Sequence, residues 1–173
     1  MNLRLGVPKE PENETRVGIV PSSMKKLLKA GFEVLVEKGA GVSANYSDAD
    51  YEAAGAKIVP RVDALACENI VCINFPGIEG ISENTNLACV ADPFRNPEYV
   101  KQCISSNITL MSMDMIPRRL SRAQSMDVNS SQDNLAGYKA VLLGAANVPK
   151  GIPMMTTSAA VSYTHLRAHE TLL

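Results

Sequence analysis

Residues 86–117 read NLACVADPFRNPEYVKQCISSNITLMSMDMIP, and this stretch decides the fold class. It starts with a short apolar run, residues 86–94, and ends with a second one, residues 108–117. The residues between them follow a helical pattern, with Asn96 at the N-cap position and Pro97 at the first helical position. Strands that do not alternate and are separated by helices of about ten residues are typical of a parallel sheet covered on both faces.

The same succession of strands and helices extends back to the N-terminus. Two helix ends are well marked, because Gly31 and Gly55 stand where a left-handed residue closes a helix. Ser47 and Asp50 have the spacing of a capping box at the start of the second of these helices. We expect strands over residues 3–10, 32–39, 56–59 and 69–76, and helices over residues 20–31, 47–56 and 61–68.

Composition indicates a soluble globular chain. Of its 173 residues, 46% are hydrophobic and 20% are charged, and the formal net charge is −1. A charge so close to zero gives no reason to expect nucleic acid or an anionic membrane as a partner. We expect no signal peptide, no membrane insertion and a cytoplasmic location. The four cysteines form no C-x-x-C pair, and three of them lie within or beside apolar runs, so we expect buried, reduced thiols.

A polar stretch, SRAQSMDVNSSQDNLAGY at residues 121–138, follows the apolar run 108–117. Parallel sheets bind ligands beyond the carboxyl ends of their strands, and this stretch begins at such an end. Its side chains, with the preceding arginine, supply guanidinium, amide, carboxylate and hydroxyl groups that suit a carboxamide such as nicotinamide; the residues are Arg119, Arg122, Gln124, Asp127, Ser130 and Gln132. The alternative is a plain capped loop in which Ser121 and Gln124 serve only the backbone.

A long helix is expected after this loop. Ser130 and Asp133 have capping-box spacing, and an apolar stripe runs along Leu135, Tyr138, Leu142 and Ala145. The sequence NVPKGIP at residues 147–153 ends the helix.

Three weaker patterns have plainer explanations. GAGVSA at residues 39–44 has the form of a dinucleotide fingerprint, but no helix pattern opens directly after it, so we favour a tight turn. In the loop 6–21, Lys9 and Arg16 either face an anionic ligand or are simply solvated. His165 and His169 have the spacing of a metal pair on a helix, but no third ligand lies nearby, and we expect no metal site.

The segment RRLSRAQSMDVNSSQDNLAGYKAV at residues 118–141 strongly resembles the NAD(H)-binding alpha subunit of proton-translocating NAD(P)+ transhydrogenases. The text VPKEPENETRVGIVP and its continuation to residue 58 resemble the same alanine dehydrogenase/transhydrogenase N-terminal domain family. The resemblance covers residues 1–160. Residues 161–173 fall outside it, and we expect them to be an artefactual tail. The resemblance implies a flavodoxin-like or Rossmann-like, mostly parallel α/β sheet with helices on both faces. It also implies that the family's second NAD-binding domain is missing.

The resemblance also implies the site and its chemistry. The loop that orients the nicotinamide of NADH would comprise Arg119, Leu120, Ser121, Arg122, Gln124, Asp127 and Ser130, with Tyr138 supporting it from the following helix. Arg118 competes with Arg119 for the role of the nicotinamide-loop arginine. The implied activity is hydride transfer from NADH to NADP+, coupled to proton translocation. NADP(H) would be bound by a partner domain.

The resemblance further implies membrane and NADP(H)-binding partner components, a homodimer when intact, and a peripheral place at the membrane through those partners. The isolated chain would be inactive. Alanine dehydrogenases carry a catalytic Lys and a His after two central strands, and the corresponding texts here, CINFPG at 72–77 and LACVADPF at 87–94, contain neither. An alanine-dehydrogenase-like enzyme and an inactive or non-enzymatic α/β binding module remain the alternatives.

Overall fold

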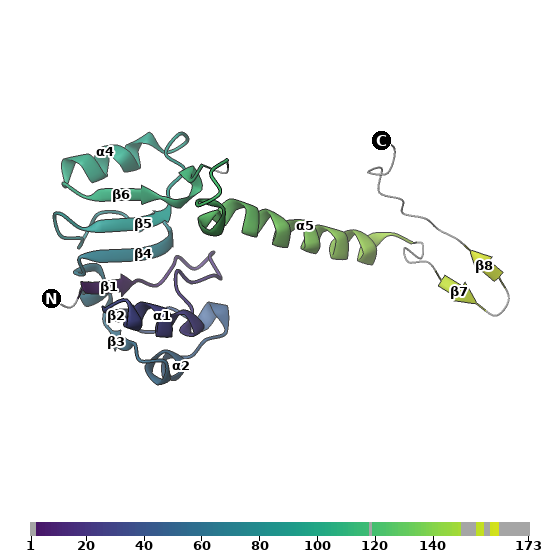
Figure 1. Ribbon diagram of the computed structural model, residues 1–173, viewed down its shortest axis with the longest axis horizontal. Helices are drawn as coiled ribbons and strands as arrows, with labels where there is room; N and C mark the ends of the chain where they lie inside the picture. Colours follow the sequence, from purple (N-terminus) through teal and green to yellow (C-terminus); the bar gives the residue numbers. More distant parts are fainter. Residues whose placement is uncertain (1–2, 118, 150–154, 158–159, 163–173) are drawn as a thin grey trace. The chain divides into compact units, whose positions relative to one another are not determined.

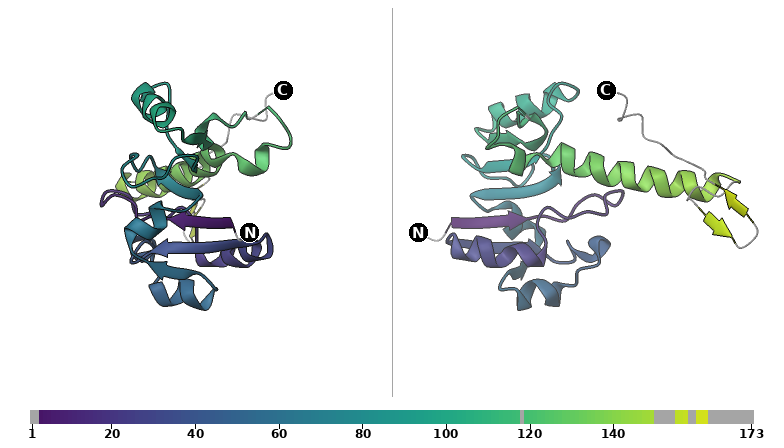
Figure 2. Two further views of the ribbon diagram at one scale, coloured as in Figure 1. Left: turned by 90° about the vertical axis from the view of Figure 1, so that its left-hand side faces the viewer. Right: turned by 45° about the vertical axis from the view of Figure 1, so that its right-hand side comes forward.

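The computed structural model describes residues 3–117, 119–149, 155–157 and 160–162. The chain divides into two compact units, Met1–Asp127 and Val128–Leu173, here called the sheet unit and the helix unit. The sheet unit contains a six-stranded sheet with the order β3-β2-β1-β4-β5-β6 (Figures 1 and 2). Its strands are β1 (Leu3–Val7), β2 (Phe32–Glu37), β3 (Lys57–Val59), β4 (Asn69–Asn74), β5 (Asn86–Val90) and β6 (Thr109–Ser112).

Every pairing in this sheet is parallel, which confirms the predicted α/β class. Of the two arrangements that were predicted, the observed order is the Rossmann one. From β1 the chain moves outward to β2 and β3, and then crosses back to β4 and moves outward in the other direction. The order therefore reverses between β1 and β4, and this is the place where open α/β sheets bind ligands.

The predicted helices are present, with bounds close to those expected. The α-helices of the sheet unit are α1 (Met24–Lys29), α2 (Asp48–Ala53), α3 (Arg61–Leu65) and α4 (Pro97–Ser105), and the short 3₁₀ helices are η1 (Pro21–Ser23), η2 (Val42–Ala44), η3 (Met113–Met115) and η4 (Gln124–Met126). The capping box of Ser47 and Asp50 is confirmed in both directions. Gly31 and Gly55 close their helices with φ angles of 90° and 97°.

The side chains of β1 show how helices cover both faces of the sheet. Leu5 and Val7 pack in one core with Met24 of α1. Gly6 points to the opposite face, because successive residues of a strand alternate. A Cβ atom on Gly6 would lie 1.9 Å from the carbonyl oxygen of Ala64 in α3, so only glycine fits there. Thus α1 and α3 lie on opposite faces, as predicted.

A second core lies on the α3 face and holds most of the cysteines. It includes Leu65 of α3, Ile70 and Cys72 of β4, Cys89 of β5 and Cys103 of α4. All four cysteines are buried and unpaired, which confirms that prediction. Burial raises the pKa of the Cys67 thiol to about 11, so this thiol is protonated near neutral pH.

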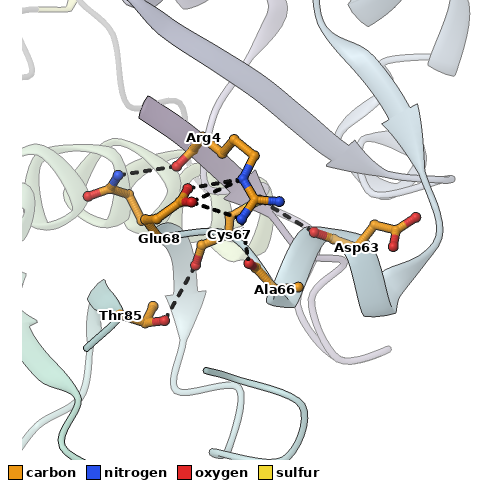
Figure 3. Close-up of polar contacts among 7 residues, drawn as sticks. Arg4, Asp63, Ala66, Cys67, Glu68 and Thr85 are labelled. Carbon is orange, nitrogen blue, oxygen red and sulfur yellow. Dashed lines mark hydrogen bonds and ion pairs between the residues drawn. The ribbon is translucent and has the colours of Figure 1, made fainter. Parts of the chain in front are cut away.

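Polar contacts fasten the amino-terminal ends of the central strands (Figure 3). The guanidinium of Arg4 donates to both carboxylate oxygens of Glu68, with the shortest distance 2.8 Å, and to the carbonyl of Ala66. The hydroxyl of Thr85 donates to the carbonyl of Cys67. The amide of Asn69 donates to the carbonyl of Arg4. These groups bond one another and the backbone, so the polar side chains at this end of the sheet stabilise the fold.

Several expected strands are shorter in the structure: β1, β2, β4 and β5 each end two to four residues before the predicted boundary. The apolar run 108–117 gives a strand of only four residues, because η3 starts at Met113. The strand is also half exposed, since it lies at the edge of the sheet. Asn96 does stand before α4, but its side chain makes no capping bond and instead donates to the carbonyls of Ala91 and Asp92.

The helix unit contains α5 (Val128–Asn147) and an antiparallel pair of short strands, β7 (Met155–Thr157) and β8 (Ala160–Ser162). The predicted long helix and its end at residue 147 are confirmed. It begins three residues earlier than the capping-box spacing implied, so Ser130 lies in its first turn and not at its N-cap. The stripe residues Leu135, Tyr138 and Leu142 are exposed.

Candidate functional site

Residues Arg119–Asp127, here called the β6 loop, follow β6 and η3 and form a tightly wound segment. Four backbone N–H groups each donate to the carbonyl three residues earlier, at 2.9–3.3 Å: Leu120 to Pro117, Ala123 to Leu120, Met126 to Ala123 and Asp127 to Gln124. Ala123 is 6% exposed and anchors the segment by burying its methyl group. The loop thus has a backbone fixed by local hydrogen bonds and one apolar anchor.

The predicted binding side chains extend outward from this backbone. The side chains of Arg119, Ser121, Arg122 and Gln124 are exposed, Leu120 is 58% exposed, and Asp127 is half-buried. Within the described residues, the side chains of Arg119, Arg122 and Gln124 make no hydrogen bond. The hydroxyl that serves the loop backbone belongs to Ser125, which donates to the carbonyl of Arg122. The plain capped loop was expected to use the side chains of Ser121 and Gln124 for hydrogen bonds to the backbone, and neither makes such a bond among the described residues.

Asp127 and Ser130 lie at the junction with α5. Asp127 stands directly before the helix in an extended conformation, with φ −74° and ψ 91°, which is the position of an N-cap residue. Ser130 and Tyr138 belong to the helix unit, where both are exposed. The supporting role of Tyr138 stays a prediction, as does the choice between Arg118 and Arg119, because Arg118 lies outside the described residues.

A cavity of about 290 Å³ lies at the carboxyl ends of β1 and β4, where the strand order reverses. Here it is called the switch-point cavity. Its lining comes from the segment after β1, the start of α3 and the end of β4: Pro8, Lys9, Glu10, Pro11, Arg61, Cys72, Asn74, Phe75 and Pro76. The ring of Phe75 stacks on Tyr99 of α4, with centroids 4.3 Å apart.

Two charged side chains of this cavity, Glu10 and Arg61, are held by hydrogen bonds to neighbouring groups. Glu10 is 8% exposed and accepts hydrogen bonds from the backbone N–H of Ile73 at 2.5 Å and of Asn74 at 3.0 Å, and from the side-chain amide of Asn74. Its carboxylate satisfies β4 where that strand's register is irregular. Arg61 donates to the carbonyl of Lys9 and to the carboxylate of Glu37. The polar side of the cavity therefore has a geometry that is fixed by hydrogen bonds within the fold.

Lys9 and Arg16 were expected either to face an anionic ligand or to be solvated. The structure gives them different surroundings. Lys9 lines the cavity. Arg16 instead forms an ion pair with Glu14, at 2.6 Å, outside the cavity lining. The hydrogen bonds from Arg16 hold the pKa of the Glu14 carboxyl at about 2, against a usual value of 4.5.

GAGVSA forms a turn, as favoured. Gly39 has a φ of 74° and donates its N–H to the carboxylate of Asp48 at 2.8 Å. A Cβ atom on Gly41 would lie 2.5 Å from the Tyr51 ring. Only the three-residue η2 follows, so the glycines here serve a close turn and ring packing.

Among the described residues, no group of three or more His, Cys, Asp or Glu side chains is arranged to hold a metal ion. His165 and His169 lie outside the described residues. In the part of the chain that the structure describes, no helix combines the length and apolar character required to cross a membrane.

Sequence reasoning missed the switch-point cavity, and with it Glu10 and Arg61. The signal was present in Pro8–Pro11 and Asn74–Pro76, two segments with Pro and polar residues that each follow a strand. Their proximity depends on β1 lying beside β4, and the linear pattern of strands and helices does not give that order.

Comparisons with known proteins agree on one family. The sequence profile described as alanine dehydrogenase/PNT, N-terminal domain matches residues 6–136. The chain is 41% identical over 168 residues to an NAD(P) transhydrogenase alpha subunit polypeptide of Rhodospirillum rubrum, covering 91% of this chain and 44% of that protein.

Two solved structures show the same fold. The crystal structure of transhydrogenase from Sinorhizobium meliloti superimposes with a TM-score of 0.84 at 38% identity, over 90% of this chain and 48% of that one. An L-alanine dehydrogenase gives a TM-score of 0.63 at 31% identity, over 69% of this chain and 34% of the enzyme. The chain thus spans about half the length, or less, of the proteins it matches.

Proposed function

This chain belongs to the alanine dehydrogenase/PNT N-terminal domain family, and from that premise we propose that it serves the NADH side of a proton-translocating NAD(P)+ transhydrogenase. The reaction is hydride transfer from NADH to NADP+. The main support in sequence is the relative named as a transhydrogenase alpha subunit, matched along 91% of this chain. The alanine dehydrogenase match is weaker in TM-score and in coverage.

The observation that carries the proposal is the β6 loop, with its fixed backbone and outward polar side chains. A nicotinamide carboxamide has an oxygen that needs a donor and an NH₂ that needs an acceptor. Gln124 offers both in one side chain, and Arg119 and Arg122 add fork-shaped donors for the carboxamide or phosphate oxygens. The donor set therefore fits NAD(H), which when bound supplies the hydride.

The task of these residues is orientation. Hydride transfer between two nicotinamide rings needs no protein acid or base, but it needs the rings held at contact distance and shielded from water. In this proposal Gln124 and Arg119 fix the carboxamide end. Asp127 fixes the end of the loop, and Leu120 and Ser121 shape the rim. Ser130 and Tyr138 stay predictions that the family resemblance alone implies.

The chemistry expected of an alanine dehydrogenase is absent from the corresponding strand ends. β4 is followed by Phe75 and Pro76, and β5 by Ala91 and Asp92, with no lysine or histidine among them. The chain has no histidine before His165. An assay with pyruvate and ammonia in the presence of NADH would reveal this activity, and we expect none.

The proposal includes partners. NADP(H) would be bound by a separate component, and proton translocation would take place in a membrane component, so this chain would be peripheral to the membrane through them. A homodimer is expected for the intact subunit. The 173-residue chain spans 44% of the R. rubrum subunit, and tested by itself it should bind NADH less tightly than the full-length subunit.

The test uses the full-length subunit reconstituted with its partner components. Arg119→Ala and Gln124→Ala should each slow hydride transfer by about 10- to 100-fold, the range for one lost orienting contact. Melting temperatures should not change, because neither side chain bonds to the described fold. Lys25→Ala, at an exposed lysine on α1, is the matched control and should be neutral. Wild-type turnover in both loop variants would overturn the proposal. Arg118→Ala, measured beside Arg119→Ala, decides which arginine acts.

A further inference from the structure

Two of the buried cysteines, Cys72 of β4 and Cys89 of β5, lie next to each other in the sheet. The register of β4 on β5 is irregular between Val71 and Asn74, where β4 has one residue more than its partner strand. Cys72 belongs to this irregular segment, and Cys89 is the residue of β5 that lies beside it. Both side chains belong to the second core, on the face that carries α3 and α4. The two thiols therefore lie side by side on one face of the sheet.

The spacing of the two strands suits a covalent bond between these thiols. The Cys72 thiol is hydrogen-bonded to Cys89, and this bond, followed by burial, raises the pKa of the Cys72 thiol above its usual value. Adjacent strands of a sheet lie about 4.8 Å apart, and a disulfide joins cysteines whose Cα atoms are about 4.4–6.8 Å apart. The irregular register also leaves one residue of β4 outside regular pairing. The backbone there can therefore adjust to a disulfide without breaking the rest of the sheet.

The switch-point cavity gives a small oxidant access to this pair. Of the four cysteines, all within the described residues, Cys72 is the one that lines the cavity. Cys72 is 6% exposed, against 0% for Cys67 and Cys89 and 2% for Cys103. A water molecule takes up about 30 Å³ in the liquid, so a cavity of about 290 Å³ admits a molecule as small as hydrogen peroxide. Cys72 is therefore the thiol that such a molecule would reach first.

We propose that Cys72 and Cys89 form a reversible disulfide on exposure to a peroxide, so that the pair is a redox modification site. Cys72 loses its proton, its sulfur attacks one peroxide oxygen and the O–O bond breaks, which leaves a sulfenic acid on Cys72 and one water. The sulfur of Cys89 then attacks the sulfenic sulfur, the S–O bond breaks, and the second water leaves with the Cys89 proton. The two thiols lose two electrons in total, and hydrogen peroxide is reduced to two waters. This inference does not depend on the proposed NADH function.

The contact between the two thiols decides which product forms. The thiolate is the form that attacks a peroxide, so the raised pKa of Cys72 makes the first step slow and keeps the pair reduced unless the peroxide persists. Once the sulfenic acid has formed on Cys72, however, Cys89 is already in contact with it. The disulfide should therefore form before a second peroxide molecule converts Cys72 to the sulfinic acid, which is irreversible. Cys89 thus protects Cys72 from permanent oxidation.

Peptide mass spectrometry of the full-length subunit tests the proposal. The folded protein is treated with hydrogen peroxide, and its remaining free thiols are alkylated after denaturation. Cleavage after glutamate, at sites that include Glu79 and Glu83, then places the two cysteines on different peptides. We expect a linked pair of peptides that joins Cys72 to Cys89 and that dithiothreitol separates. Absence of this link, formation of the link only in urea, or a preferred link from Cys72 to another cysteine would overturn the proposal.

Two single variants provide a matched comparison. In Cys89→Ala, Cys72 has lost its partner, so peroxide should convert it to the sulfinic acid, which dithiothreitol does not reverse. Cys103→Ala removes another cysteine of the same core and should leave the link between Cys72 and Cys89 unchanged. Full recovery of the Cys72 thiol by dithiothreitol in Cys89→Ala, or loss of the link in folded Cys103→Ala, would contradict the proposal. If Cys89→Ala fails to fold, the linkage in the wild-type protein decides the question.

Discussion

Two polar regions lie at the carboxyl edge of the same sheet, and their side chains are used in opposite ways. In the switch-point cavity, Glu10 and Arg61 are bonded to neighbouring backbone and carboxylate groups. In the β6 loop, the backbone bonds itself, and Arg119, Arg122 and Gln124 extend outward. Polar side chains that are hydrogen-bonded within the fold contribute to its stability, whereas polar side chains exposed on a fixed backbone are available to a ligand. Mutations in the two regions should therefore separate stability from activity.

The largest expected effect is on stability, at Glu10. Glu10→Ala removes the acceptor for two backbone N–H groups of β4, and each buried unsatisfied donor costs about 1–3 kcal/mol. We expect a loss of about 3 kcal/mol in the free energy of unfolding, measured as a lower urea midpoint. Glu12→Ala, at an exposed glutamate two residues away, is the control. A midpoint that stays at the wild-type value with Glu10→Ala would mean that the cavity wall is not a structural element.

The next effect sharpens the contrast within the β6 loop. Ala123→Asp places a carboxylate at the loop's buried anchor, and burying an unpaired polar group costs about 1–3 kcal/mol. The loop should detach locally, so hydride transfer should fall at least as far as with Gln124→Ala, while the urea midpoint falls less than with Glu10→Ala. Ser125→Ala, beside it, should retain most activity. Full activity with Ala123→Asp would show that the loop backbone need not be fixed.

A smaller effect concerns acid stability near the cavity. The folded-state pKa of Glu14 is lowered from 4.5 to about 2 by Arg16. A carboxyl with a depressed folded pKa contributes stability that is present above the unfolded value and is lost as pH falls toward the folded one. Between about pH 4.5 and pH 2, wild-type protein should lose about 1 kcal/mol more than Arg16→Ala, a value reduced for the partial exposure of the pair. Parallel urea midpoints across this range in the two proteins would refute the pairing.

The smallest expected effect is at Arg122. Its side chain is exposed and makes no hydrogen bond among the described residues, so Arg122→Ala should change the free energy of unfolding by less than about 0.5 kcal/mol. The melting temperature should match that of wild type within error, as judged by calorimetry. A clear fall in the melting temperature would show that Arg122, like Glu10, stabilises the fold. It would remove the distinction between the two regions.

The sequence predicted local elements well because the deciding signals are local. The Ser47–Asp50 box, Gly31, Gly55 and the apolar runs each act within a few residues. The β6 loop was also predictable, because a contiguous segment carries both its backbone turns and its side chains. The switch-point cavity was not, because Glu10 and Asn74 meet only when β1 pairs with β4. The early end of β6 reflects its place at the sheet edge, which a run of apolar letters does not reveal.

The central claim is that the β6 loop binds the nicotinamide end of NADH and leaves the fold independent of it. The most direct measurement compares the affinities of the full-length subunit for NADH and for ADP-ribose, which lacks nicotinamide, in wild type and in Gln124→Ala. We predict that the NADH dissociation constant rises about 10-fold, the value of one lost hydrogen bond of about 1.4 kcal/mol, and that the ADP-ribose constant does not change. Equal weakening of both ligands, or no change in either, would contradict the account.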